Sequence, residues 1–171
     1  MANKANFTAD EWSRVLASPM VASSAITASD LSGLWGPLKE GMAGGWALLK
    51  GKQDANTNPL VKAVADDFSS GEAKTMARDR MHTIFKDAQA SQVKRRAVSE
   101  LRSVASILDT KAPTDAVAFK TWLREVAQKA AEAAKEGGFL NFRGVAVSDA
   151  EKATLAEISA ALGTTASSRA E

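Results

Sequence analysis

The stretch Asp115–Lys135, DAVAFKTWLREVAQKAAEAAK, decides the fold class of this chain. Its large apolar residues and alanines recur three and four positions apart, which is the spacing of one face of an α-helix. The residues predicted to form the buried face are Phe119, Trp122, Leu123, Val126, Ala127 and Ala130. Gly137 and Gly138 follow the stretch and are predicted to end the helix. The same helical period recurs almost throughout the sequence.

Local signals predict where several of the other helices begin. Thr8 with Glu11 and Ser148 with Glu151 are capping boxes, in which the hydroxyl and the carboxylate satisfy free backbone N–H groups. Phe7 precedes the first box and is predicted to pack against the start of that helix. A second apolar stripe consists of Val93, Ala97, Leu101, Val104 and Leu108. Gly163 is predicted to end the last helix.

Prolines divide the remaining helical stretches. Pro19 is expected to end a short first helix, with Ser18 capping the next one. Pro37 and Pro59 are expected in the first turns of two further helices, and a weak break is predicted near residues 90–91. Residues 109–114, around Pro113, are predicted to form a turn.

We therefore predict an all-α fold, a compact irregular bundle of six to eight helices without a sheet. The length of 171 residues and an apolar content of 45% suit one domain with a real core. Residues 1–163 are predicted to form this single helical domain, and residues 164–171 a flexible C-terminal tail.

Composition excludes several chemistries. The chain has no cysteine, which removes disulfides, thiolate metal sites and cysteine nucleophiles. His82 is the only histidine, so a histidine-based hydrolase or a di-iron bundle is not predicted, and we expect His82 to be a surface or packing residue. The sequence predicts neither a signal peptide nor a membrane-spanning segment, because it lacks an apolar run of the required length. We expect a cytoplasmic bacterial protein with no membrane partner.

The segment Ser29–Trp46, SDLSGLWGPLKEGMAGGW, holds five of the eleven glycines and raises the question of a phosphate-binding loop. Such a loop needs a preceding strand and a defined glycine spacing, and the segment has neither. Gly41, Gly44 and Gly45 are instead predicted to line a helix face that another helix approaches closely. Asp30 and Glu40 flank the glycines and supply oxygen ligands of the kind that magnesium or calcium prefers.

The segment from Lys74 to Arg102 carries eight basic and three acidic residues in a chain of net charge +2. This asymmetry suggests an anionic partner, such as nucleic acid, bound through Arg78, Arg95 and Arg96. Arg95 and Arg96 are consecutive, however, and therefore point in different directions around a helix. We favour the interpretation of this segment as a solvated helix surface.

Two pieces of the sequence resemble the tellurite-resistance B-like helical family. Ala28-Ser29-Asp30, continuing to Gly33 and Glu40, is similar to the acidic Asp-Gly…Glu element after that family's first helix. Residues 144–163, GVAVSDAEKATLAEISAALG, are similar to its closing helix. This resemblance covers under a quarter of the chain and implies a divalent-metal site at Asp30 and Glu40, although Asp30 is not followed directly by glycine. The chain also resembles bacterial all-helical proteins with no assigned activity.

We predict a binding or scaffolding protein without catalytic activity and without a bound cofactor, acting through a protein partner or by self-association. One alternative is a carboxylate-based metal-binding stress protein that uses Asp30 and Glu40. The other is a binder of nucleic acid or an acidic partner through a basic helical face, with nucleic acid the less favoured partner.

Overall fold

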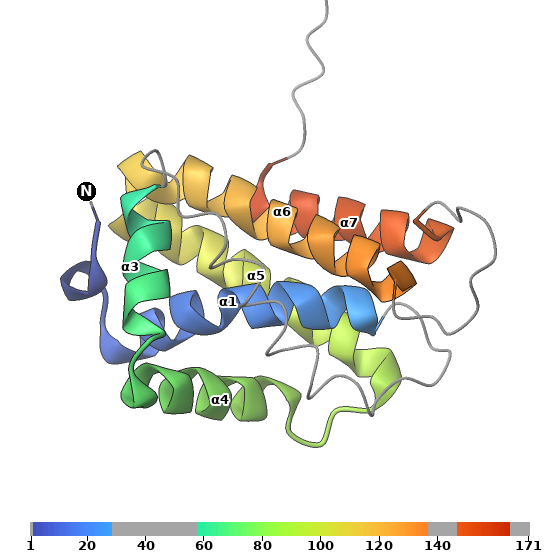
Figure 1. Cartoon of the computed structure of the whole chain (residues 1–171), viewed down its shortest axis with the longest axis horizontal. Coiled ribbons are helices and arrows are strands. Elements are labelled where there is room, and N and C mark those ends of the chain that lie inside the picture. Colours follow the sequence, from blue (N-terminus) through green and yellow to red (C-terminus); the bar gives the residue numbers. More distant parts are fainter. Residues whose placement is uncertain (1, 29–57, 137–146, 165–171) are drawn as a thin grey trace, which may run out of the picture.

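The computed structural model describes residues 2–28, 58–136 and 147–164 of the chain. In these ranges every regular element is helical and there is no strand (Figure 1). The elements are a 3-10 helix, Lys4–Asn6, and the α-helices α1 (Ala9–Thr27), α3 (Pro59–Asp67), α4 (Gly71–Phe85), α5 (Ala90–Lys111), α6 (Pro113–Glu136) and α7 (Asp149–Leu162). This confirms the predicted all-α fold of six to eight helices without a sheet. The predicted tail lies outside the described residues apart from Thr164, and the domain boundary at residue 163 stays a prediction.

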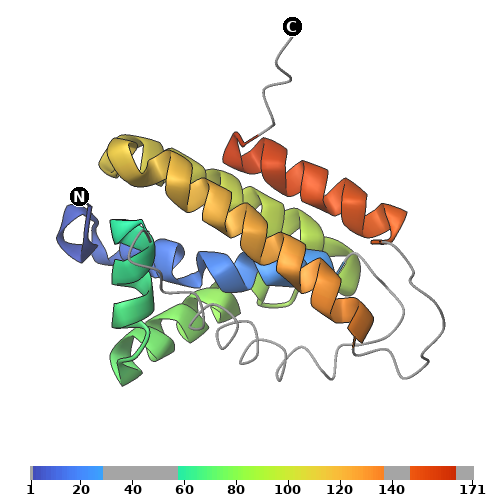
Figure 2. The same cartoon turned by 45° about the horizontal axis from the view of Figure 1, so that its top comes forward.

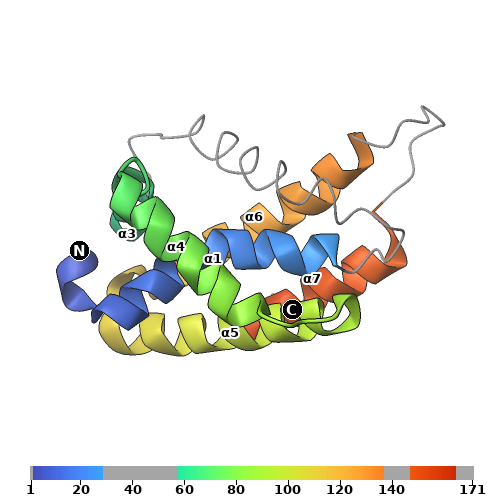
Figure 3. The ribbon, with the colours of Figure 1, turned by 90° about the horizontal axis from the view of Figure 1, so that it is seen from below.

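Helix α1 lies in the middle of the bundle and contacts α4, α5, α6 and α7 (Figures 1 and 3). Thirteen of its nineteen residues are buried. Among them, Trp12, Leu16 and Ile26 have almost no exposed surface. A helix with so few exposed positions can form only if neighbours cover it from several sides, because each uncovered apolar side chain would lose its contribution to the core.

The two apolar stripes predicted from the sequence pack against α1. All members of the α5 stripe are buried, and so are Phe119 and Leu123 of α6. Trp122 and Ala130 of α6 are only partly buried, and the Trp122 ring packs against Phe119 with the ring centroids 5.0 Å apart. Figure 2 shows α6 crossing over α1, with α7 lying beside α5 and α6.

A buried carboxylate fixes one end of the bundle, where α3 crosses the start of α6 (Figure 1). Asp115 is 5% exposed and lies in the first turn of α6. Its Oδ2 accepts a hydrogen bond of 2.7 Å from the backbone N–H of Ala2, and its Oδ1 accepts one of 3.0 Å from Nδ2 of Asn58. Asn58 in turn caps α3 by accepting from the backbone N–H of Leu60. One side chain therefore joins the N-terminal segment, α3 and α6.

The predicted capping boxes are confirmed. The hydroxyl of Thr8 accepts from the backbone N–H of Glu11 and the Glu11 carboxylate accepts from that of Thr8, at 3.2 and 2.8 Å. The box at the start of α7 has the same two bonds. The rings of Phe7 and Trp12 lie 5.5 Å apart, which is the hydrophobic contact expected across a helix start. Gly163 ends α7 with φ +67°, a conformation that favours glycine.

The predicted break at Pro19 is wrong, because α1 continues through it. A proline in a helix interior leaves the carbonyl four residues earlier without its N–H partner. Here that carbonyl belongs to Val15, and it accepts a hydrogen bond of 2.7 Å from the hydroxyl of Ser18. Val15 and Ser18 are both fully buried, so the hydroxyl satisfies an acceptor that water does not reach. Ser18 thus permits the proline inside the helix instead of starting a new one.

Two other boundaries differ from the sequence prediction. The break expected near residues 90–91 falls earlier, between Phe85 and Ala90, where Asp87 has a φ of +56°. The turn predicted at residues 109–114 shrinks to Ala112, which lies between the end of α5 and Pro113 at the first position of α6. The carbonyl of Ala112 already accepts from the backbone N–H groups of Asp115 and Ala116, so α6 begins at once.

We expect Ser18→Ala to lower the free energy of unfolding by about 2 kcal/mol, because it leaves the buried Val15 carbonyl without a partner. The matched control is Ser13→Ala. The Ser13 hydroxyl also donates to a carbonyl three residues earlier, that of Asp10, but the helix itself supplies a second donor there. Urea denaturation followed by circular dichroism measures both variants.

The same replacement in a Pro19→Ala background provides the decisive comparison. Alanine at position 19 restores the N–H that the Val15 carbonyl lacks. In this background Ser18→Ala should lower the free energy of unfolding by about 0.5 kcal/mol at most. An equal loss in both backgrounds would show that the hydroxyl does not compensate for the proline.

Candidate functional site

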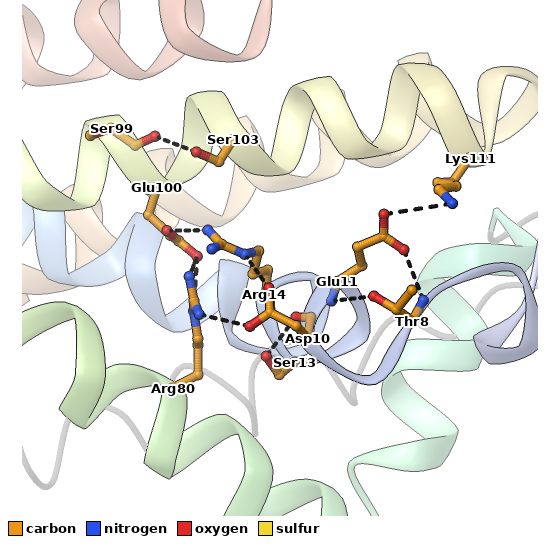
Figure 4. Close-up of polar contacts among 10 residues, drawn as sticks. All are labelled: Thr8, Asp10, Glu11, Ser13, Arg14, Arg80, Ser99, Glu100, Ser103 and Lys111. Atoms are coloured by element: carbon orange, nitrogen blue, oxygen red, sulfur yellow. Dashed lines mark hydrogen bonds and ion pairs between the residues drawn. The ribbon is translucent and has the colours of Figure 1, made fainter.

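Four charged side chains meet where α1, α4 and α5 approach one another (Figure 4). Glu100 of α5 is at the centre. One of its carboxylate oxygens accepts from Nη1 of Arg14 at 2.9 Å, and the other accepts from Nε and Nη2 of Arg80 at 3.0 and 2.8 Å. Asp10 completes the group, since it accepts from Nε of Arg14 at 3.0 Å and from Nη1 of Arg80 at 3.2 Å. We call these four residues the Glu100 cluster.

The Glu100 cluster is buried at its centre and open at one edge. The side chains of Glu100 and Arg80 are 9% and 12% exposed, that of Arg14 is 25% exposed and that of Asp10 is 66% exposed. Two carboxylates face two guanidinium groups, so the formal charges cancel. Burial of a charge is costly unless it is paired and hydrogen-bonded, and the five short contacts meet that requirement.

Hydrogen bonds shift the acid–base properties of two carboxyl groups at the start of α1. The bond from Arg14 holds the pKa of Asp10 below its ordinary value, against a smaller opposing effect of burial. The bond from the Thr8 backbone N–H lowers the pKa of Glu11 in the same way. The Lys111 ammonium, whose Nζ lies 3.6 Å from the Glu11 carboxylate, favours the same ionised form.

An open groove of about 590 Å³ lies beside the cluster, between the start of α1 and the length of α4. Helix α4 contributes one face of residues at three- and four-residue spacing, and α1 contributes the other wall. The groove residues are Asp10 and Ser13 of α1, and Gly71, Glu72, Thr75, Met76, Asp79, Arg80 and Thr83 of α4. We call this surface the α1/α4 groove.

The α1/α4 groove is negatively charged. It contains three carboxylates and one guanidinium, and Asp10 and Arg80 are already paired within the Glu100 cluster. The carboxylates of Glu72 and Asp79 are exposed and form no ion pair or hydrogen bond with any residue in the described ranges. They leave two uncompensated negative charges on a chain whose net charge is +2. Half-buried Met76 lies between them in the α4 sequence.

The arginines that the sequence suggested for an anionic partner come from two helices. Arg78 belongs to α4 and is exposed, whereas Arg95 and Arg96 belong to α5. Nη1 of Arg96 donates to the carbonyl oxygens of Ile84 and Lys86, at 3.2 and 2.8 Å. These carbonyls end α4, so Arg96 serves as a cap for that helix, a role that suits a cation at a helix C-terminus.

The other predicted site residues, Asp30, Glu40, Gly41, Gly44 and Gly45, lie outside the described residues and stay predictions. Within the part of the chain that the structure describes, no group of three or more acidic or histidine side chains could hold a metal ion. His82 is exposed on α4.

Sequence reasoning missed the Glu100 cluster and the groove. No local signal marks Arg14 as a partner of Glu100, which lies 86 residues away. The groove carboxylates did leave a signal, because Glu72 and Asp79 are seven residues apart with Met76 between them. That spacing places them on one face of a helix.

No protein-family model, curated protein or solved structure matches this chain. The resemblance to the tellurite-resistance B-like family therefore stays a prediction. Within the described ranges, no helix combines the length and the apolar character needed to cross a membrane.

We expect Glu100→Ala to lower the free energy of unfolding by about 3 kcal/mol, because two largely buried guanidinium groups lose their common partner. Glu157→Ala is the matched control, since Glu157 also pairs with a basic residue of another element, Lys94, at 2.8 Å, but with its side chain 45% exposed. That variant should lose less than about 1 kcal/mol. Equal losses in chemical denaturation would refute a special role for Glu100.

Acidification should destabilise the start of α1. The pKa values of Asp10 and Glu11 are lower in the folded chain than the ordinary values of 3.8 and 4.5, so the unfolded chain binds more protons in this range. Their stabilisation is complete above the ordinary values and is lost as the pH falls through the folded values. Urea midpoints measured across this window should depend less on pH in the double variant Asp10→Asn, Glu11→Gln. An unchanged pH dependence would contradict the assignment.

Proposed function

We propose that this chain is a non-catalytic helical binding module whose α1/α4 groove receives a positively charged helix of a protein partner. The observation that carries the proposal is the pair of unpaired carboxylates, Glu72 and Asp79, on the groove face of α4. Their negative charges are opposite in sign to the net charge of the chain, and they favour the binding of a cationic group in this groove.

The spacing of the two carboxylates favours a helical partner. Seven residues of α-helix correspond to two turns and a rise of about 10.5 Å. A partner helix with Lys or Arg at two positions seven residues apart presents both cations on one face at the same separation. An apolar residue between those cations would contact Met76. The groove thus fits the mode in which an amphipathic helix lies along a surface groove.

The open shape of the groove favours an elongated partner over a small molecule. Small-molecule sites enclose most of the surface of their ligand, and they are typically deep. The α1/α4 groove runs along α4 and is open to solvent, so it would leave a small cation largely exposed. An intracellular setting belongs to this proposal, and the lack of cysteine supports it.

A titration with designed peptides tests this function. The first peptide is an alanine-rich helix with two arginines seven residues apart and a leucine between them on the same face. The second peptide has the same composition with its arginines on opposite faces. We expect saturable binding of the first peptide only, measured by fluorescence anisotropy, and we expect added salt to weaken it because the charges are exposed.

Variants of the protein locate the binding surface. Glu72→Gln with Asp79→Asn should weaken binding of the first peptide by about tenfold, since two exposed ion pairs are lost. Glu125→Gln with Glu132→Gln is the matched control, because these are also exposed carboxylates seven residues apart on one helix, but outside the groove. Binding that is insensitive to the first double variant, or equally sensitive to both, would refute the proposal.

A further inference from the structure

The chain itself contains a helix face with the charge spacing required of the groove's partner. In the whole sequence, Arg95 and Arg102 are the only two basic residues seven positions apart. Both belong to α5, both are exposed, and neither forms an ion pair or hydrogen bond with any residue that the structure describes. They are two uncompensated positive charges at the same spacing as the two negative charges of the groove.

The acidic counterpart is equally restricted. The sequence has only two pairs of acidic residues seven positions apart, Glu72 with Asp79 and Glu125 with Glu132. The second pair does not line the groove, and Glu132 accepts a hydrogen bond of 3.0 Å from Nε2 of Gln128. The groove pair is therefore the acidic pair whose carboxylates are both available.

The arginines cannot reach the groove of their own chain. Glu100 marks the side of α5 that faces α1 and α4. With 3.6 residues per turn, Arg95 and Arg102 lie about 140° and 160° around the helix from Glu100. Ser99 and Ser103 lie about 100° and 60° from Glu100, on the same flank of α5 as the two arginines, and both are exposed (Figure 4). We call the exposed residues Arg95, Ser99, Arg102 and Ser103 the outer face of α5.

The small side chains of this outer face allow another surface to approach closely. Ser99 occupies the position between the two arginines, as Met76 does between the two groove carboxylates. The Ser103 hydroxyl is directed to the Ser99 carbonyl, 3.3 Å away, and does not extend outward as a long side chain would. An α5 helix could therefore lie along α4 with its two arginines at the two carboxylates.

We propose that this chain binds a second copy of itself, with the outer face of α5 of one copy in the α1/α4 groove of the other. Arg95 and Arg102 pair with Glu72 and Asp79 in this contact. The inference rests on the proposed function of the groove and adds the identity of the partner. Exposed ion pairs are individually weak and are screened by salt, so the association is reversible, concentration-dependent and favoured at low ionic strength.

Sedimentation velocity across a concentration series tests the self-association. The full chain should show a weight-average mass that rises with concentration at low salt and returns to that of one chain at high salt. Glu72→Lys with Asp79→Lys should weaken association by about tenfold or more, because like charges then face each other. Arg95→Glu with Arg102→Glu should do the same. The control, Glu125→Lys with Glu132→Lys, changes net charge as the first variant does and should keep its concentration dependence.

A mixture of the two charge-reversed variants provides the sharpest test. In the mixture, the basic groove of one variant can accept the acidic α5 face of the other, and the unchanged surfaces can pair as well. We expect each variant alone to sediment as a single chain and the mixture to regain a higher mass. Circular dichroism checks that both variants are folded.

Three outcomes would overturn the inference: a constant single-chain mass for the wild-type protein, association that neither double variant weakens, or a mixture that does not recover. The peptide titration remains a separate measurement. If the groove binds the designed peptide and the chain does not associate with itself, the proposed function stands and the identity of the partner is wrong. If neither occurs, both fail.

Discussion

The bonds from Glu100 to Arg14 and Arg80 determine how three helices fit together. A carboxylate that is 9% exposed must be paired, and its two partners come from α1 and from α4. The pairing joins α4 to the start of α1 beside the groove that lies between them. Arg80 and Asp10 are neutralised within the cluster. The net negative charge of the groove therefore comes from Glu72 and Asp79. The charge of the α1/α4 groove thus depends on which side chains the Glu100 cluster pairs.

Much of the helical architecture could be predicted because its signals are local. A capping box involves residues three positions apart, and the structure places the boxes at Thr8 and Ser148 where the sequence predicted them. The failure at Pro19 has one local cause and one tertiary cause. A proline is expected to end a helix because it lacks a backbone N–H. In α1 the hydroxyl of Ser18 supplies the missing donor. The burial of α1 from several sides also stabilises the continuous helix.

The candidate site was less predictable, because its members come from elements far apart in the sequence. Charge composition identified the segment that contains Arg80 and Arg96 as basic, yet it could not show which groups these two guanidiniums bind. Arg80 pairs with Glu100 in the largely buried cluster, and Arg96 donates to the carbonyls that end α4. The charges that stay exposed include two pairs at a spacing of seven residues, Glu72 with Asp79 and Arg95 with Arg102. Spacing on a helix is visible in a sequence, whereas neutralisation by a distant partner requires the fold.

The central position of α1 has a consequence for the order in which the chain can fold. During synthesis α1 leaves the ribosome before any of the helices that cover it, and α5, one of its main neighbours, does not begin until Ala90. Until α4 and the later helices have formed, side chains such as Leu16 and Ile26 lack most of the native surface that they pack against. The nascent chain therefore carries an incompletely covered apolar segment until about half of it has been made, and exposed apolar surface of this kind is prone to aggregation. Contacts between segments so far apart in sequence also slow folding relative to a bundle of sequential hairpins.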